Sequence, residues 1–335
     1  MRTRKKAILR ARRMSYIALH SKKLVYDVER DSFGEVFCAP TVFSFIEDPK
    51  GTTEFFENFT SFVIQERNFG QRIFVDMSQI EILTIDALMY LLALMDNFSQ
   101  DIRTKYTFAG CFPKDPTINT LMRDAGFSRF VKSKEKKPIE RNTNNIQIVS
   151  GEKVDVLLAK RMCDFLIRKG KTTKVACRFL YNMMIELMAN VYAHAYTETH
   201  DFLSSQWYCF AECDPSGNTV NFTFMDTGDG IPSTVRKHGL EHIDVLNLTG
   251  DGPYVISALR GELRSKTRQA YRGKGLPKIF SFCQNNLIKN VRIITDKADI
   301  SVIGAEPVSN ELSTPLRGTL FYWQITLSDL TKEVA

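Results

Sequence analysis

The chain has 335 residues, of which 44% are hydrophobic and 25% charged, a composition typical of folded globular domains. Its length predicts two domains, or one large domain with an appendage. It contains no apolar run of about 18 residues and no signal-peptide pattern, so the sequence predicts neither a membrane span nor secretion. The seven cysteines are dispersed and include no C-x-x-C pair, which favours reduced thiols in the cytoplasm over a metal site.

Positive charge is concentrated at the N-terminus. Lys and Arg number 45 against 38 Asp and Glu, a net charge of +7, and the segment MRTRKKAILRARR alone holds seven basic residues and no acidic one. We expect residues 1–20 to form a basic arm, either a solvated terminus or a contact for nucleic acid or an acidic partner. The rest of the chain is neutral and shows no basic-aromatic interleaving, so nucleic-acid binding by the folded body is not expected.

Strand and helix patterns alternate in residues 21–131. In chain order they are strands at 24–28 and 35–38, a helix at 52–68, a buried strand at 72–77, a strongly apolar helix at 84–98, a strand at 105–110, and a helix from 116 that closes at Gly126. Such alternation predicts a small sheet with helices packed on it, a small α/β domain.

The clearest boundary is the charged, polar segment KSKEKKPIERNTNN, residues 132–145. It has almost nothing to bury, which predicts a linker before a second domain at 146–335. The patterns there are helices at 154–168 and 174–195, hairpin strands at 206–214 and 219–226, a helix from about Lys274, and strands at 291–296, 299–304 and 318–327. Helices followed by mostly antiparallel strands predict an α+β sandwich, one sheet under a helical layer.

A polar stripe runs along the helix predicted at 174–195. In IELMANVYAHA, Glu186, Asn190 and His194 recur at every fourth position, so they project from one face of the helix. The residues between them are apolar, which indicates the wall of a lined cavity rather than a solvated face. His194, near the helix end, fits a packed histidine as well as a site residue.

Two glycine motifs follow in the second domain. FMDTGDGIP presents Asp226 at the tip of a strand, and Gly228 and Gly230 would let the backbone approach a flat ligand, although a plain turn has the same pattern. RGKGLPKIF places Gly273 and Gly275 at a helix start, where free N–H groups favour an anion. The flanking positive charges fit an anion site or a flexible basic loop; they are Lys266, Arg268, Arg272 and Lys274.

The segment between these motifs and the start of the last strand complete the pattern. Residues 227–272 show no strong periodicity over a length that is typical of a functional lid or of disorder. Gly318 and Thr319, in RGTLFYW, enter the last strand and mean little by themselves.

Taken in order, these motifs resemble the GHKL ATP-binding fold, the family of gyrase, histidine kinases and anti-sigma serine kinases. ELMANVYAHAY is similar to the family's N box, particularly in the anti-sigma-kinase style with a histidine after the asparagine. The resemblance covers about residues 146–330. It implies a Bergerat α/β sandwich, with residues 227–272 as an ATP lid.

The resemblance also implies a role for each motif residue. Asn190 would hold the Mg²⁺ that bridges the phosphates of ATP. Glu186 would be the general base, with a further contact to the metal through water, and Asp226 would accept a hydrogen bond from the adenine amino group. The remaining nucleotide-binding residues that it implies are Gly228, Gly230, Ile231, Lys266, Gly273, Lys274, Gly275, Leu276 and Thr319.

Residues 44–131 resemble a STAS domain, the anti-sigma-factor-antagonist fold, through FVDMSQIEILTIDALMYLLAL and YTFAGCFPKDPTINTLMRDAGFSRF. Aligned without a gap, the phosphoacceptor position of that family falls on Ile85. With two residues inserted, Asp86 matches the family's Asp and Ala87 its Ser. None of these residues has a hydroxyl, so phosphorylation at the usual place is not expected, although Thr84 is adjacent.

Three functions compete. The leading interpretation is a Mg-dependent ATP-binding protein that acts as a nucleotide-driven conformational switch or slow ATPase and regulates a protein partner or its own STAS-like domain. The alternative is a serine/threonine protein kinase of the anti-sigma-factor type, and the second alternative is a catalytically inactive interaction module. The expected cofactors are ATP and Mg²⁺. A homodimer is compatible with the resemblance, and a membrane partner is not expected.

Overall fold

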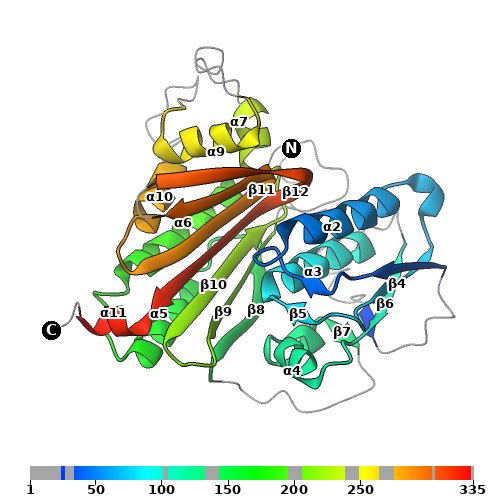
Figure 1. The fold of residues 1–335 in the computed structure, drawn as a ribbon, viewed down its shortest axis with the longest axis horizontal. Coiled ribbons are helices and arrows are strands. Elements are labelled where there is room, and N and C mark those ends of the chain that lie inside the picture. The colour runs from blue at the N-terminus through cyan, green and yellow to red at the C-terminus, as the bar shows by residue number, and fades with distance from the viewer. Residues whose placement is uncertain are drawn as a thin grey trace, which may run out of the picture.

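The computed structural model describes residues 24–26, 34–100, 105–132, 143–194, 206–237, 249–263, 275–303 and 306–332. The predicted basic arm, residues 1–20, lies outside them. The described residues form a mixed α/β structure with one parallel and one antiparallel five-stranded sheet and a small two-stranded sheet (Figure 1). Among the helices in these ranges, none is long and apolar enough to cross a bilayer.

The first five-stranded sheet is parallel throughout and has the strand order β2-β4-β6-β1-β7. Its strands are β1 (Leu24–Tyr26), β2 (Glu35–Cys38), β4 (Arg72–Asp76), β6 (Thr107–Cys111) and β7 (Val131–Lys132). A small parallel pair joins β3 (Val42–Phe43) to β5 (Ile82–Leu83). The predicted alternation of strands and helices is confirmed, and the two strands predicted first are not neighbours, because β1 lies between β6 and β7.

The helices of this half are α2 (Pro49–Val63), α3 (Ile85–Gln100) and α4 (Pro116–Asp124), with 3₁₀ turns η2 (Glu66–Asn68) and η3 (Phe127–Arg129). α2 begins three residues before the predicted start at 52, because the Asp48 side chain accepts a hydrogen bond from the Gly51 N–H at 3.0 Å and Pro49 suits the first helical position. Gly126 follows α4 with φ 87°, as predicted from its place at the helix end.

α3 is buried on every side. All its side chains from Ala87 to Met95 are at most 3% exposed. It packs between the two large sheets, since its core cluster includes Ile73 and Phe108 from the parallel sheet and Phe210 from the antiparallel one. A helix that is apolar all round is typical of such complete burial.

The second five-stranded sheet is antiparallel throughout, in the order β11-β12-β10-β9-β8. Its strands are β8 (Asn145–Gly151), β9 (Trp207–Cys213), β10 (Thr219–Asp226), β11 (Ile288–Ile303) and β12 (Glu306–Thr326). The helices of this half are α5 (Val156–Gly170), α6 (Arg178–His194), α7 (Ile231–Lys237), α9 (Asp251–Arg260), α10 (Gly275–Cys283) and α11 (Leu327–Lys332). α5, α6 and α10 cover one face of the sheet, and α2 and α3 cover the other (Figure 1).

The structure corrects three sequence predictions in this half. Strands predicted separately at 291–296 and 299–304 are one strand, β11, whose pairing with β12 shifts register around Asp296. Such a shift interrupts the alternation of side chains, which is why the pattern looks broken. β12 starts well before the predicted position 318. The segment 227–272, predicted to lack periodic structure, contains α7 and α9.

The predicted linker at 132–145 is also shorter than expected at both ends. Lys132 belongs to β7, and Asn145 begins β8, a strand that the sequence did not predict. Residues 133–142 lie outside the described part of the chain. β8 pairs with β9 through backbone hydrogen bonds, so its polar residues at alternate positions do not prevent strand formation.

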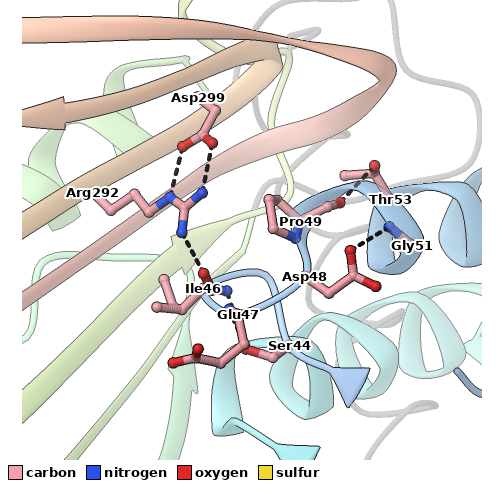
Figure 2. A network of polar contacts seen from close by, with 9 residues as sticks. All are labelled: Ser44, Ile46, Glu47, Asp48, Pro49, Gly51, Thr53, Arg292 and Asp299. Atoms are coloured by element: carbon pink, nitrogen blue, oxygen red, sulfur yellow. Dashed lines mark hydrogen bonds and ion pairs between the residues drawn. The ribbon is translucent and has the colours of Figure 1, made fainter. Parts of the chain in front are cut away.

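Direct contacts join the two halves. The Arg292 guanidinium on β11 holds both carboxylate oxygens of Asp299, at 2.7 and 2.6 Å, and donates a further hydrogen bond to the Ile46 carbonyl in the loop before α2 (Figure 2). The Tyr90 hydroxyl on α3 donates to the Arg317 carbonyl on β12 at 3.0 Å. The parallel half therefore packs on the sheet of the antiparallel half through both its core and specific polar contacts.

Candidate functional site

The polar stripe of α6 lies where that helix meets α10. The apolar side chains of α6, including Leu187, Met188 and Val191, are buried in the core under the sheet. Glu186 and Asn190 are half-buried on the side that contacts α10. His194 is the last residue of α6. The helix thus buries one face and presents Glu186 and Asn190 on another, as the spacing predicts.

α10 begins in direct contact with this stripe. A Cβ added to Gly275 would lie 2.4 Å from Oδ1 of Asn190, so the start of α10 lies directly against the Asn190 amide group. The Lys278 ammonium forms an ion pair with Oε1 of Glu186. Leu276 packs its side chain against the core. The first backbone N–H groups of α10 have no partner within the helix, and they lie beside an amide oxygen and a carboxylate.

A second group of predicted residues surrounds the end of β10. Asp226, the last residue of β10, lies opposite Thr319 on β12. Its carboxylate accepts hydrogen bonds from the Gly228 N–H at 2.8 Å and from the Thr319 side chain. Burial nevertheless raises the pKa of Asp226 to about 7, because the loss of hydration outweighs these hydrogen bonds.

The glycines of the D-x-G-x-G motif are required by close approaches. A Cβ on Gly228 would lie 2.9 Å from a carboxylate oxygen of Asp226. Gly230 has φ 81°, and its added Cβ would lie 2.9 Å from the Thr295 hydroxyl and 3.0 Å from the Asp296 carboxylate. The motif is therefore wrapped around Asp226 and pressed against β11, a more constrained arrangement than a plain surface turn.

Thr295, which the sequence did not indicate, connects this group. It is fully buried, and its hydroxyl accepts from the Ile231 N–H at 2.9 Å and donates to the Gly318 carbonyl at 2.9 Å. Gly318 itself has φ 96°, and an added Cβ would lie 2.0 Å from the Asp226 carbonyl oxygen. The local signal at Thr295 is a polar residue that follows the strand-like run VRII, although nothing local shows its distant partners.

Further polar contacts fasten α7 and α9 to the same stretch of β11. The Asp296 carboxylate accepts from the Ser233 N–H at 3.2 Å and from its hydroxyl at 2.9 Å. Asp251, at the start of α9, forms an ion pair with Arg236 of α7 and accepts from the Lys297 N–H at 2.9 Å. Burial raises the pKa of Asp296. The two described parts of the predicted lid, which contain α7 and α9, are therefore both anchored to β11.

Both groups lie on the side of the antiparallel sheet that α5, α6 and α10 cover. Side chains alternate along a strand, and Phe224 and Phe321 belong to the core under α5, α6 and α10. Asp226 lies two positions after Phe224, and Thr319 lies two positions before Phe321, so both side chains share that face. The structure thus assembles Glu186, Asn190 and Gly275 in one group and Asp226, Gly228, Gly230, Ile231 and Thr319 in another. Lys266, Gly273 and Lys274 lie outside the described residues.

The donor atoms of the first group suit a hard cation that keeps other oxygen ligands. Within the described ranges, no three His, Cys, Asp or Glu side chains gather into a metal site. Asn190 and Glu186 offer one amide and one carboxylate. Mg²⁺ commonly binds through one or two protein oxygens together with the phosphates of a nucleotide, so this pair fits Mg²⁺ carried by a nucleotide better than a cage made by the protein alone.

The phosphoacceptor position considered in the parallel half is internal. Asp86, at the start of α3, is 1% exposed and accepts from the Phe45 N–H at 2.9 Å, and burial raises its pKa. Ile85 and Ala87 are also buried. The Thr84 hydroxyl donates to the Ser44 hydroxyl at 2.6 Å. These groups are used to hold the loop before α2 against α3.

Comparison of the chain with models of known protein families gives no match, and comparison with curated proteins finds no similar sequence.

Proposed function

We propose that this chain binds ATP together with Mg²⁺ through a GHKL-type module, residues 146–335, and works as a nucleotide-driven conformational switch or slow ATPase. The observation that carries the proposal is that Glu186 and Asn190 on α6, and the paired Asp226 and Thr319 on β10 and β12, lie on the same side of the antiparallel sheet. These residues come from distant parts of the sequence. Each group has the chemistry needed for one end of a nucleotide.

Asp226 suits the adenine end. Its carboxylate is fixed by Gly228 and Thr319, and the backbone of the D-x-G-x-G turn wraps closely around it. An ionised carboxylate accepts the hydrogen bond of an exocyclic amine and stays in place while doing so. Asp226→Asn should therefore weaken ATP binding, because the amide would present a donor as well as an acceptor.

Glu186 and Asn190 suit the phosphate end. The start of α10 adds N–H groups that have no partner within the helix, and the positive end of the helix dipole, beside them. Asn190, with Glu186 through water, would hold Mg²⁺, which when bound neutralises phosphate charge. Glu186 would take the proton of an attacking water or hydroxyl, because its carboxylate is only 22% exposed and lies beside the phosphate end.

The parallel half is proposed as a STAS-like unit, residues 21–131, that responds to the nucleotide state. Support comes from its strand-helix order, from the position of Asp86 at the start of a buried helix, and from its packing on the antiparallel sheet. Because the STAS-type acceptor position is internal here, regulation by contact between the halves, or with a protein partner, fits better than regulation by phosphorylation of Asp86 or its neighbours.

The test is a phosphate balance on the purified full chain with Mg²⁺ and ATP, measuring ADP, free phosphate and phosphate on protein. We expect slow formation of ADP with equal free phosphate, lost in Glu186→Gln while ATP binding remains. Phosphate retained on this chain or on an added partner would instead support a protein kinase. Binding without turnover would leave a pure switch, and no ATP binding at all would refute the proposal.

A further inference from the structure

Lys278 stands out because its charge is placed against the local electrostatics. It lies in the first turn of α10, where the positive end of the helix dipole disfavours a cation. That turn contains no acidic residue. The negative charge comes instead from Glu186 on α6, in an ion pair whose two side chains are 51% and 22% exposed. A lysine at this position therefore depends on an anion supplied from outside its own helix.

The ion pair is easy to exchange. Pairs this accessible to water add little to stability, so Lys278 can leave Glu186 at low cost. The terminal phosphate of a nucleoside triphosphate carries more negative charge than one carboxylate and offers more acceptor oxygens. An anion arriving at the start of α10 would meet the ammonium and the free N–H groups together.

We propose that Lys278 makes the site selective for nucleoside triphosphates over diphosphates. This inference rests on the proposed binding of ATP at the same site. With a triphosphate bound, the Lys278 ammonium pairs with the terminal phosphate and leaves the Glu186 carboxylate unpaired, ready to accept a proton. With a diphosphate bound, the Lys278–Glu186 pair persists. The same ammonium thus binds the terminal phosphate when it is present, and it determines whether the Glu186 carboxylate is paired.

The experiment measures the affinities of ADP and a non-hydrolysable ATP analogue for the full chain by calorimetry in Mg²⁺. Lys278→Met keeps most of the aliphatic stem and removes the charge. We expect this substitution to lower the affinity for the triphosphate about tenfold, as for the loss of one charge-assisted hydrogen bond. The affinity for ADP should change less than about twofold. Lys278→Arg should retain most of the selectivity. Lys289→Met, an exposed lysine on β11, is the matched control and should change neither affinity.

A double-mutant cycle with Glu186→Gln separates exchange of the pair from simple charge effects. Glu186→Gln alone should strengthen triphosphate binding severalfold, because it removes both the competitor for Lys278 and a repulsive charge, while its amide oxygen can still accept a hydrogen bond from a metal-bound water. In the Lys278→Met background the part of this gain that comes from releasing Lys278 should vanish, leaving the two changes non-additive. Thermal melts of each variant check that the fold is kept.

The outcomes distinguish this inference from the function on which it rests. If wild type binds both nucleotides and Lys278→Met weakens both equally, or neither, then selectivity does not come from Lys278, while ATP binding stands. Additive effects in the cycle would also overturn the exchange of partners. If wild type binds neither nucleotide, the proposed function fails, and this inference fails with it.

Discussion

Several single residues around Asp226 are fixed by contacts that leave almost no freedom of substitution. Gly318 approaches the Asp226 carbonyl, Gly228 approaches its carboxylate, and Thr295 ties the neighbouring segments together. The result is a carboxyl group held in a defined place at the cost of its hydration. Its raised pKa follows from that position and makes the protonation of Asp226 a measurable consequence of the fold.

Asp226 should make stability depend on pH. Its pKa rises from 3.8 in the unfolded chain to about 7 in the folded one, so the folded state binds more protons between these values. Stability from this group is then highest below about pH 4 and falls as pH rises towards 7, by up to about 4 kcal/mol in total. Urea unfolding of wild type and Asp226→Asn across this range is the measurement, and the difference between them should shrink at low pH. A difference that does not change with pH would contradict the assignment.

Gly318→Ala should be far more damaging than a glycine substitution with the same backbone strain alone. The added Cβ would lie 2.0 Å from the Asp226 carbonyl oxygen, whereas Gly217, with a similar positive φ of 75°, has nothing within 4 Å. We expect Gly217→Ala to cost about 1 kcal/mol in unfolding free energy and Gly318→Ala at least about 3 kcal/mol. Chemical denaturation of both variants compares strain alone with strain plus a clash. Equal losses would mean that the β10–β12 contact relaxes easily.

At the level of elements, the site is built where segments with different periodicities meet. α6 contributes side chains at helical spacing, β10 and β12 contribute a facing pair, and β11 contributes the irregular stretch at Thr295 and Asp296. α7 begins directly on that stretch through Ile231. A substitution in this stretch of β11 should therefore alter the position of Asp226 at the end of β10, although the two strands are far apart in the sequence.

Thr295→Val tests this connection. Valine has nearly the same shape and removes the hydroxyl, which leaves the Ile231 N–H and the Gly318 carbonyl without this partner in the interior. We expect a loss of about 2–4 kcal/mol in unfolding free energy and a clear loss of ATP affinity, because the segments around Asp226 are no longer tied together. Thr295→Ser keeps the hydroxyl and should retain most of both properties. Denaturation and nucleotide titration of the two variants make the comparison, and a normal affinity in Thr295→Val would argue against the connection.

Features of this chain that are set by short-range interactions could be predicted from the sequence. The polar stripe of α6, the turn after Asp226 and the apolar helix α3 could be predicted from local spacing and composition, so Glu186, Asn190 and Asp226 could be proposed as site residues from the sequence alone. α9 was missed because Gly252 and Pro253 resemble turn residues. In the structure Gly252 is needed where its Cβ would lie 2.0 Å from the Ser309 hydroxyl, and proline is tolerated in a first helical turn.

Long-range contacts account for most of what the sequence could not predict. The Thr295 hydroxyl binds a backbone group 64 residues away, and Arg292 reaches a carbonyl 246 residues away. The pairing of Lys278 with Glu186 spans 92 residues. Neither local propensity nor hydrophobic periodicity carries information on such partners. β8 escaped for a related reason, since it is specified mainly by its pairing with β9.

At the level of the whole molecule, one sheet serves both halves. The face covered by α5, α6 and α10 carries the proposed nucleotide site, and the opposite face packs on α2 and α3 (Figure 1). The Tyr90 hydroxyl binds the Arg317 carbonyl, directly before Gly318 and Thr319. A physical connection therefore leads from the parallel half to the residues that support Asp226.

Tyr90→Phe should weaken this connection and leave the packing intact. The ring is 3% exposed and remains in place, and only the hydrogen bond to Arg317 is lost. We expect unfolding free energy to fall by about 1–2 kcal/mol and ATP affinity to change severalfold. Tyr106→Phe, which removes a hydroxyl bound to the Val63 carbonyl inside the parallel half, is the control and should cost similar stability without changing affinity. The same affinity in both variants would show that the halves are not coupled through Tyr90.

Arg292 should contribute to stability mainly because the buried Asp299 carboxylate requires a cationic partner. Their side chains are 20% and 3% exposed, and Arg292 also binds the Ile46 carbonyl of the other half (Figure 2). Arg292→Met leaves a buried carboxylate unpaired and should cost about 3–5 kcal/mol in unfolding free energy. Adding Asp299→Asn should recover part of that loss, as measured by denaturation of the single and double variants. No recovery would mean that the contact with Ile46 dominates.

The two-sided use of β12 has a consequence for how this chain can change its length. Along this strand Thr319, Phe321 and Trp323 face the helices, while Leu320 and Tyr322 between them face the parallel half. Inserting or deleting one residue here would move each set of side chains to the opposite face of the sheet. The rings of Phe321 and Trp323 would then face the parallel half, and Thr319 would turn away from Asp226. Substitutions can be compensated one at a time, but a change of one residue in length cannot, so gain or loss of residues should be confined to the turns at the ends of this strand.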